Sequence, residues 1–177
     1  MNTSVCTFLL LFGLGVSSMN AGNPVYIIGN FNGHGYELIP EPTPWQIAKK
    51  NAEEAGGYLV VITSPEENEF IKQFIQKSCQ GEFCATFLGL SDSENEGTWR
   101  WVNGEKYTFQ SWFPQTQPDN YLGSENVVEI VKSENTIHWN DVSSDRRLPY
   151  IVEYNYELND SQSVTRRGTK SGLRSTR

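Results

Sequence analysis

Five oxygen-bearing side chains lie close together in the second half of this sequence. They are Gln117, Asp119, Glu125, Asn140 and Asp141, and they include no cysteine or histidine. Carboxylate and amide oxygens, without thiolate or imidazole, form the ligand set of a hard cation such as calcium. The five residues therefore predict a binding site for a hard divalent cation, and Ca2+ is the expected cofactor.

A long loop carries Gln117 and Asp119 and ends next to Glu125. Residues 92–124 are rich in Gly, Asn, Pro, Ser and Trp, and a loop of that length inside a compact domain is usually functional. The alternative is a surface meander held by Trp99, Trp101 and Trp112. In either case we expect these tryptophans to anchor the loop to the core.

Helices precede this loop and short strands surround it. One helix is expected over residues 44–55, before the Gly56-Gly57 pair, and a second begins at Thr63 or Ser64. Strands are expected over residues 34–39, 58–62, 85–90, 125–131, 136–139 and 150–154. Helices first and antiparallel strands afterwards indicate an α+β fold.

The composition fits one domain with short tails. The chain has 177 residues, of which 37% are hydrophobic, enough to bury a core. Its 14 lysines and arginines stand against 21 acidic residues, and several of the basic ones lie in the last dozen positions, so the globular part is acidic. An acidic domain argues against nucleic acid as a partner, because phosphate contacts need a basic surface.

The two ends of the chain differ from the domain expected over residues 34–157. Residues 1–21 are predicted to be a signal peptide, because an apolar run over residues 5–16 precedes small residues; this indicates a secreted, extracellular protein. An uncleaved anchor is the rival interpretation, but the run is too short for a stable membrane span. Residues 22–33 form a short N-terminal segment, and residues 158–177 are expected to be a disordered basic tail.

Several motifs occur in a specific order along the chain. They are WQIAKKNAEEAGGYLVVITSPEENEFI at 45–71, FLGLSDSENEGTWRWVNGE at 87–105, Gln-Pro-Asp at 117–119, Trp-Asn-Asp at 139–141 and PYIVEY at 149–154. Through them the sequence resembles the C-type lectin domain family over roughly residues 35–154. The resemblance implies a C-type lectin-like fold, with two helices flanking short antiparallel sheets and a long calcium-binding loop.

The same resemblance assigns the five oxygen-bearing residues to a principal calcium site that also holds a sugar. The Gln-Pro-Asp form accompanies galactose and N-acetylgalactosamine, so the implied partners are galactose-type glycans or glycoproteins. Tyr121 lies where galactose binders place a stacking tryptophan, although the Gly-rich insertion often found beside it is absent; an exposed loop aromatic is the alternative. Pro118 matches a cis-proline, and Asp141 is expected to be a ligand outside the core.

An auxiliary calcium site that shares Glu125 is also implied. Its further residues are Asp92, Glu96, Asn120 and Asn126. Two asparagines stand where the family often has acids, and this loss of negative charge lowers the expected affinity for calcium.

Cysteine usage departs from the family pattern. The positions of the two usual disulfides are filled by Ala52, Val127, Ser144 and Val152. The helix residue and the last-strand residue of one lost bridge are both small and apolar, so they can pack in the vacated volume. Cys79 and Cys84 are expected to form a local disulfide if the chain is exported; two free thiols are the alternative.

No catalytic set accompanies the predicted site. His34 and His138 lack partner motifs, and no serine or cysteine nucleophile signature occurs, so we expect a binding protein and not an enzyme. The resemblance implies calcium-dependent carbohydrate binding. The alternative is a lectin-like domain that binds a protein or another surface ligand, with calcium only structural. The sequence contains no coiled-coil heptads from which to predict an oligomeric state.

Overall fold

The computed structural model describes residues 27–79, 81, 83–134, 136–158 and 164–166. In chain order its elements are β1 (Ile27–Phe31), β2 (His34–Pro44), α1 (Trp45–Glu54), β3 (Tyr58–Leu59), α2 (Pro65–Ser78), β4 (Phe83–Ser91), β5 (Arg100–Trp101), a 3-10 turn (Tyr121–Gly123), β6 (Val127–Ser133), β7 (Thr136–Val142), β8 (Arg147–Leu158) and β9 (Val164–Arg166). The α+β expectation is confirmed. The predicted signal peptide lies outside the described residues.

The first helix is short and buries one apolar stripe. Trp45, Ala48 and Ala52, which follow one another at helical spacing, are buried. Pro44 stands at the N-cap position in extended conformation, and the helix ends before Gly56, whose φ of 81° is a left-handed value that glycine adopts without steric cost. The helix therefore begins and ends where local sequence signals predict.

The second helix has a complete N-terminal cap. The Ser64 side chain accepts a hydrogen bond from the Glu67 backbone N–H at 3.1 Å, and Pro65 occupies the first turn. Ile71, Phe74 and Ile75 are buried against the core. Of the two starting residues expected for this helix, the structure selects Ser64 as the cap.

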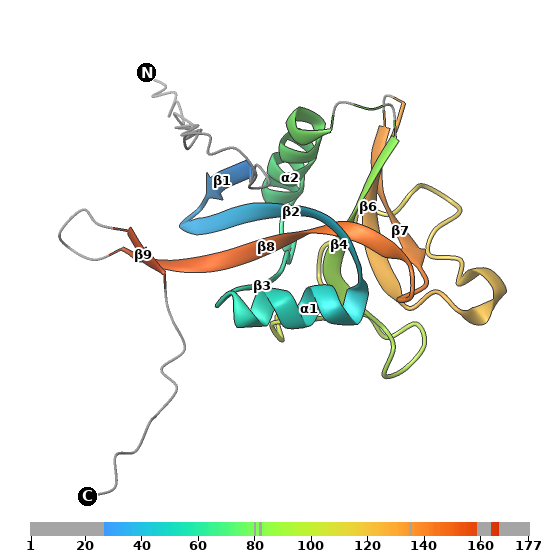
Figure 1. The fold of residues 1–177 in the computed structure, drawn as a ribbon. Helices are drawn as coiled ribbons and strands as arrows, with labels where there is room; N and C mark the ends of the chain where they lie inside the picture. Colours follow the sequence, from blue (N-terminus) through green and yellow to red (C-terminus); the bar gives the residue numbers. More distant parts are fainter. Residues whose placement is uncertain (1–26, 80, 82, 135, 159–163, 167–177) are drawn as a thin grey trace, which may run out of the picture.

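The long strands β2 and β8 form the centre of the molecule. The main sheet has the order β1-β2-β8-β4-β6-β7, and every pairing is antiparallel except the β4–β8 contact at Phe87 and Tyr150. Figure 1 shows α1 and α2 on opposite sides of the β2–β8 pair, with β4, β6 and β7 grouped at one end. The two helices flank an antiparallel sheet, as expected.

Three strands were not predicted from the sequence: the two-residue β5, which pairs with β4 inside the long loop, and the terminal strands β1 and β9. β1 pairs with β2 along its whole length, so the domain begins before residue 34. β9 pairs with the end of β8, so residues 164–166 of the expected disordered tail are ordered. β1 contains Ile27, Ile28 and Phe31, which are a local strand signal, whereas β9 lies in a polar tail whose composition favours disorder and is ordered by its pairing with β8.

Three of the four positions of the lost family cysteines lie in the packed interior, and the fourth, Ser144, is half-buried. Ala52, Val127 and Val152 are buried in one apolar cluster, and the carbonyl oxygen of Ser144 accepts a hydrogen bond from the Trp45 N–H at 3.1 Å. A disulfide joins Cys79 to Cys84 across a Cα–Cα distance of 6.3 Å. It connects the end of α2 to β4 in place of the longer-range bridges.

Neither helix in the described part of the chain is long and apolar enough to cross a membrane.

Candidate metal centre

The long loop is tied to β7 by backbone pairing and aromatic packing. Trp139 donates its N–H to the Ser111 carbonyl at 2.9 Å and accepts from the Phe113 N–H at 3.0 Å. The rings of Trp101 and Trp112 each meet the Trp139 ring edge-on at 5.9 Å. This attachment carries the Gln-Pro-Asp segment alongside the strand that bears Asn140 and Asp141.

Asp141 folds the Gln-Pro-Asp segment back onto β7. It is 1% exposed, and its two carboxylate oxygens accept the backbone N–H groups of Asp119 at 3.1 Å and Asn120 at 2.8 Å. The expectation that Asp141 lies outside the core is therefore wrong. The Asp141 carboxylate is buried because it serves as the hydrogen-bond acceptor of two loop N–H groups.

Glu125 closes the turn that follows. Its carboxylate accepts from the Tyr121 N–H at 3.0 Å, and its own N–H donates to the Asn120 side-chain oxygen at 3.1 Å. Asn120 and Leu122 have left-handed φ angles of 43° and 58°, and Leu122 is 83% exposed. An exposed leucine in this conformation is unusual, and the apolar periodicity of the sequence provided no signal for it.

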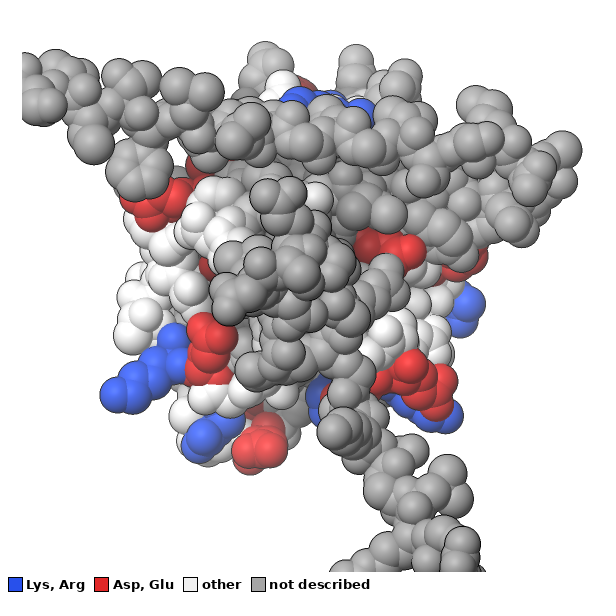
Figure 2. Space-filling view, turned by 90° about the vertical axis from the view of Figure 1, so that its left-hand side faces the viewer, with Lys and Arg blue, Asp and Glu red and all other residues white. Residues whose placement is uncertain are grey.

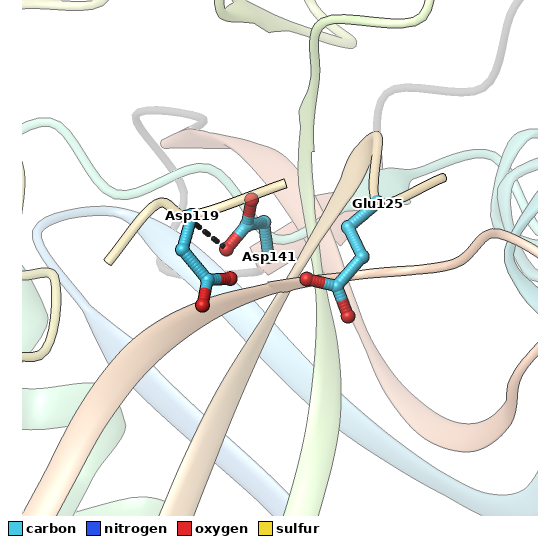
Figure 3. A group of neighbouring side chains, drawn as sticks. All are labelled: Asp119, Glu125 and Asp141. Atoms are coloured by element: carbon cyan, nitrogen blue, oxygen red, sulfur yellow. Dashed lines mark hydrogen bonds between the residues drawn. The ribbon is translucent and has the colours of Figure 1, made fainter. Parts of the chain in front are cut away.

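Three carboxylates converge at this point. One carboxylate oxygen from each of Asp119, Glu125 and Asp141 lies within 4.8 Å of the others (Figure 3). In that view Asp119 and Glu125 stand on either side of Asp141. No ion pair among the described residues involves any of the three.

The electrostatics of Glu125 reflect this convergence. Burial raises the pKa of Glu125, the N–H of Tyr121 opposes the rise, and the negative charges of Asp141 and Asp119 raise it further. Like charges held this close repel one another, so a bound cation would stabilise the arrangement.

The two predicted amide ligands have fixed orientations. The Gln117 side-chain oxygen accepts from the Asp119 N–H at 3.1 Å, and the Gln117–Pro118 peptide is cis, as expected. The Asn140 amide nitrogen donates to Oε1 of Glu129 at 3.0 Å. Sequence reasoning missed Glu129, although a glutamate within the apolar run Val127–Val131 was a signal of a functional or paired acid.

The auxiliary residues are only partly assembled. Asp92 is buried, and one of its oxygens accepts from the Gly97 N–H at 2.8 Å. Its Oδ1 and the side-chain oxygen of Asn126 are buried without hydrogen-bond partners in the described ranges of the chain. Asn120 uses its oxygen on Glu125, and Glu96 is exposed. In the described residues, Asp92 and Glu96 do not join the three-carboxylate group.

Tyr121 and Leu122 project from the rim of the centre. Tyr121 is 63% exposed, and Phe113, on the same loop, is also exposed. Tyr121 is an exposed loop aromatic next to Glu125, to whose carboxylate its backbone N–H is bonded. Two consecutive exposed apolar residues, Tyr121 and Leu122, thus follow Asn120 in the turn that Glu125 closes.

Charge on one face of the molecule is mixed. Figure 2 shows blue and red side chains interspersed around this face, with neither sign forming a continuous area among the described residues. The visible basic residues do not form the continuous basic surface that phosphate contacts need.

Comparison with known proteins identifies the family. The sequence model of the lectin C-type domain matches residues 41–154. A perlucin-like protein of Mytilus galloprovincialis is 35% identical over 107 residues, which cover 60% of this chain and 67% of that protein. C-type lectin domain family 4 member F of Mus musculus is 29% identical over 130 residues, covering 70% of this chain but 22% of the relative.

A solved structure extends the similarity to the fold. The carbohydrate-recognition domain of the mouse scavenger receptor C-type lectin aligns with a TM-score of 0.63 and 29% identity, covering 75% of this chain and 96% of that domain. These are ligand-binding lectin domains and not enzymes. Since the family match spans more than half of the sequence, the chain belongs to the C-type lectin domain family.

Proposed function

We propose that this protein is a secreted, calcium-dependent lectin for galactose-type glycans. Calcium would be held by Gln117, Asp119, Glu125, Asn140 and Asp141. The observation that carries the proposal is the convergence of three carboxylates within 4.8 Å, with no basic side chain paired to them among the described residues.

The donor chemistry fits calcium. Carboxylates with flanking amides offer only oxygen ligands, which suit Ca2+ better than the transition metals that prefer imidazole or thiolate. Asp141 is already oriented by two loop N–H groups, and Glu125 by one. These bonds hold the carboxylates in place before a cation arrives.

The protein side chains would choose the sugar. Calcium, when bound, supplies coordination to two hydroxyls of the glycan. Asp119 and Glu125 can accept protons from those hydroxyls, and the amides of Gln117 and Asn140 can donate to them. Tyr121, which is 63% exposed, offers a ring face to the apolar side of galactose.

An auxiliary calcium ion is a further part of the proposal. It would involve Asp92, Glu96, Asn120, Glu125 and Asn126. Support comes from the buried oxygens of Asp92 and Asn126 that have no hydrogen-bond partner, because buried polar atoms in proteins are nearly always satisfied. With two asparagines in the set, this ion would bind more weakly than the principal one.

The extracellular part of the proposal has independent support. The Cys79–Cys84 disulfide is a kind of bond that persists in oxidising compartments and is rare in reducing ones. Glycans or glycoproteins outside the cell would be the partners.

A second candidate function rests on the exposed apolar rim. The adjacent residues Tyr121 and Leu122 are 63% and 83% exposed, and large exposed apolar side chains that lie together mark interaction sites. In this alternative the domain binds a protein or another surface, and calcium only orders the loop.

Competition binding separates the two candidates. The purified protein is applied to an immobilised galactose-terminated glycan in millimolar calcium, with free galactose, free mannose or chelator as competitor. We expect galactose and chelator to release the protein and mannose to release little. If neither sugar competes in calcium, the carbohydrate proposal is wrong and protein binding becomes the better account.

An exchange of two residues tests the specificity. Gln117→Glu with Asp119→Asn keeps the charge and the number of side-chain oxygens, but exchanges amide and acid on either side of Pro118. Donors and acceptors for the two hydroxyls are thereby reversed. We expect competition to move from galactose towards mannose, while the affinity for calcium changes by less than about threefold.

A further inference from the structure

A buried glutamate lies behind the candidate centre. Glu129 is 2% exposed, on the strand β6, where it is directly opposite Asn140 of β7. Its Oε1 accepts two hydrogen bonds, from the Asn140 amide nitrogen at 3.0 Å and from Nη1 of Arg146 at 3.1 Å. Its Oε2 is buried and has no hydrogen-bond partner among the residues that the structure describes.

The chemistry of this contact selects one orientation of the Asn140 amide. A carboxylate can only accept hydrogen bonds, whereas a carboxamide has an oxygen on one side and an NH2 group on the other. With its NH2 group on Glu129, Asn140 has its oxygen on the opposite side of the amide, where it accepts no hydrogen bond from the described part of the chain. Rotating the amide by half a turn would place its oxygen against the Glu129 carboxylate, which would be repulsive.

Arg146 makes the buried charge tolerable. A carboxylate removed from water is costly unless it is paired and hydrogen-bonded, and the Arg146 guanidinium forms an ion pair with Glu129. Arg146 lies in the turn between β7 and β8, with its side chain 42% exposed. It therefore joins the turn that follows the candidate centre to the strand behind it.

We propose that Glu129 and Arg146 are positioning residues for the cation site: together they hold the Asn140 amide so that its oxygen is the atom offered to calcium. The inference rests on the proposed function, because it takes Asn140 as a ligand. It adds two residues that neither the sequence motifs nor the three-carboxylate group contains.

The direction in which calcium affinity changes when Arg146 is substituted distinguishes positioning of Asn140 from a general electrostatic effect. Removing the positive charge of Arg146 makes the region more acidic, and by charge alone this would strengthen calcium binding. If Arg146 acts through Glu129 and Asn140, its removal instead weakens calcium binding. The two explanations predict changes in opposite directions.

Calcium titration of Arg146→Gln is the decisive experiment. Binding is followed by the melting temperature over a calcium series and by luminescence of terbium, used as a calcium substitute that nearby aromatic side chains excite. We expect the dissociation constant to rise about tenfold, the usual effect of losing a residue that orients a metal ligand. The melting temperature in chelator should fall as well, because the buried Glu129 carboxylate loses its ion-pair partner; the dissociation constant of the folded variant is therefore the deciding readout.

Two further variants act as controls. Lys50→Gln makes the same charge change on α1, where Lys50 pairs with Glu54, and it should leave the dissociation constant unchanged or slightly lower. Arg146→Lys keeps a cation and a donor, and it should recover at least half of the lost binding free energy. Rescue by lysine would not occur if glutamine merely disturbed the turn.

Glu129→Gln tests whether the pair acts as one unit. The neutral side chain permits both orientations of Asn140, so calcium binding should weaken about tenfold. Adding Arg146→Gln to this variant should weaken it no further, since residues in one network are not additive.

The outcomes are distinguishable. If the parent binds calcium and Arg146→Gln binds it equally or more tightly, the positioning inference is overturned and the proposed function stands. If the parent binds neither calcium nor terbium, the proposed function itself fails.

Discussion

This domain contains two clusters of carboxylates that differ in their hydrogen-bonding partners. One contains Glu67 on α2 and Glu153 on β8, and both residues are buried. The other is the candidate metal centre of Asp119, Glu125 and Asp141. Their hydrogen-bonding partners explain the difference between them.

In the Glu67–Glu153 group, donors from other parts of the fold satisfy the carboxylate oxygens by hydrogen bonds. Glu67 accepts from the Tyr36 hydroxyl at 2.7 Å and from the Thr63 N–H at 2.9 Å. Burial raises the pKa of Glu67, and these hydrogen bonds oppose the rise. Each of its oxygens therefore already has a donor from the protein.

Glu153 is satisfied in the same manner. It accepts from the Tyr58 hydroxyl at 2.9 Å and from the Val61 N–H at 3.0 Å, and it pairs with Nδ1 of His34 at 2.6 Å. A hydroxyl, a backbone amide and an imidazole thus surround one carboxylate. Such a group stabilises the fold and has little capacity left for a ligand.

The metal centre lacks such partners. Backbone N–H groups orient Asp141 and Glu125, but no lysine, arginine or histidine of the described chain pairs with the three acids. The same residue type is thus structural where the fold supplies donors, and a candidate ligand where it supplies only orientation.

The largest effect is expected for a substitution that disrupts the Glu67–Glu153 group. Glu153→Ala leaves the buried Val61 N–H without its acceptor, removes the partner of His34 and leaves the Tyr58 hydroxyl with Asn155 alone. We expect the free energy of unfolding to fall by about 3 kcal/mol, equally in calcium and in chelator. Urea denaturation measures this. Glu54→Ala, an exposed acid on α1, is the control and should cost less than about 0.5 kcal/mol; a loss for Glu153→Ala as small as this would contradict a structural role.

Calcium should act on the other group alone. At a concentration one hundred times the dissociation constant, calcium should stabilise the parent by about 2.7 kcal/mol, seen as a higher melting temperature. Asp119→Ala should remove the increase without lowering the melting temperature in chelator, because this side chain is exposed. Equal melting temperatures of the parent with and without calcium would contradict the proposal that this protein binds calcium.

Asp141 has features of both groups, because it accepts hydrogen bonds from the loop backbone and also belongs to the three-carboxylate group. Asp141→Ala deprives the Asp119 and Asn120 N–H groups of their acceptor, so the variant should lose about 1 to 2 kcal/mol of stability even in chelator. Asp141→Asn, which keeps an acceptor, should lose less. Chemical denaturation in chelator, beside Asp119→Ala, measures the difference. Identical stability of the two alanine variants would mean that the loop bonds contribute nothing.

The smallest expected effect concerns pH. The hydrogen bond with Glu153 raises the pKa of His34 above its ordinary value of 6.5, with burial opposing the rise. The charged imidazole therefore stabilises the native state below about pH 6.5, and this contribution is lost as the pH rises through the folded-state pKa.

Denaturation at a series of pH values in chelator tests this statement. Because His34 is partly exposed, we expect a difference of less than about 1 kcal/mol between the two ends of the window. His34→Gln should lack this fall in stability above pH 6.5. A parent whose stability rises over the same window would contradict the sign.

Much of the fold could be read from local signals. Pro44 and Gly56 mark the ends of α1, Ser64 and Pro65 mark the start of α2, and both helices formed where expected. β9 could not be predicted in this way, because it lies in a polar tail and its pairing depends on the partner strand β8. β1, in contrast, contains the β-branched pair Ile27 and Ile28, which is a local strand signal.

Residue types and their spacing were sufficient to predict the chemistry of the candidate centre: the oxygen-only ligand set, its order along the chain and the family to which the motifs belong. Residue identity and spacing are local properties, so no tertiary information was needed for them. Tertiary structure alone decided that Asp141 is buried and that Glu129 faces Asn140. It also decided that Glu153 meets partners from β2 and β3. Those facts depend on strand register, which juxtaposes residues far apart in the chain and which a shift of one position would reverse.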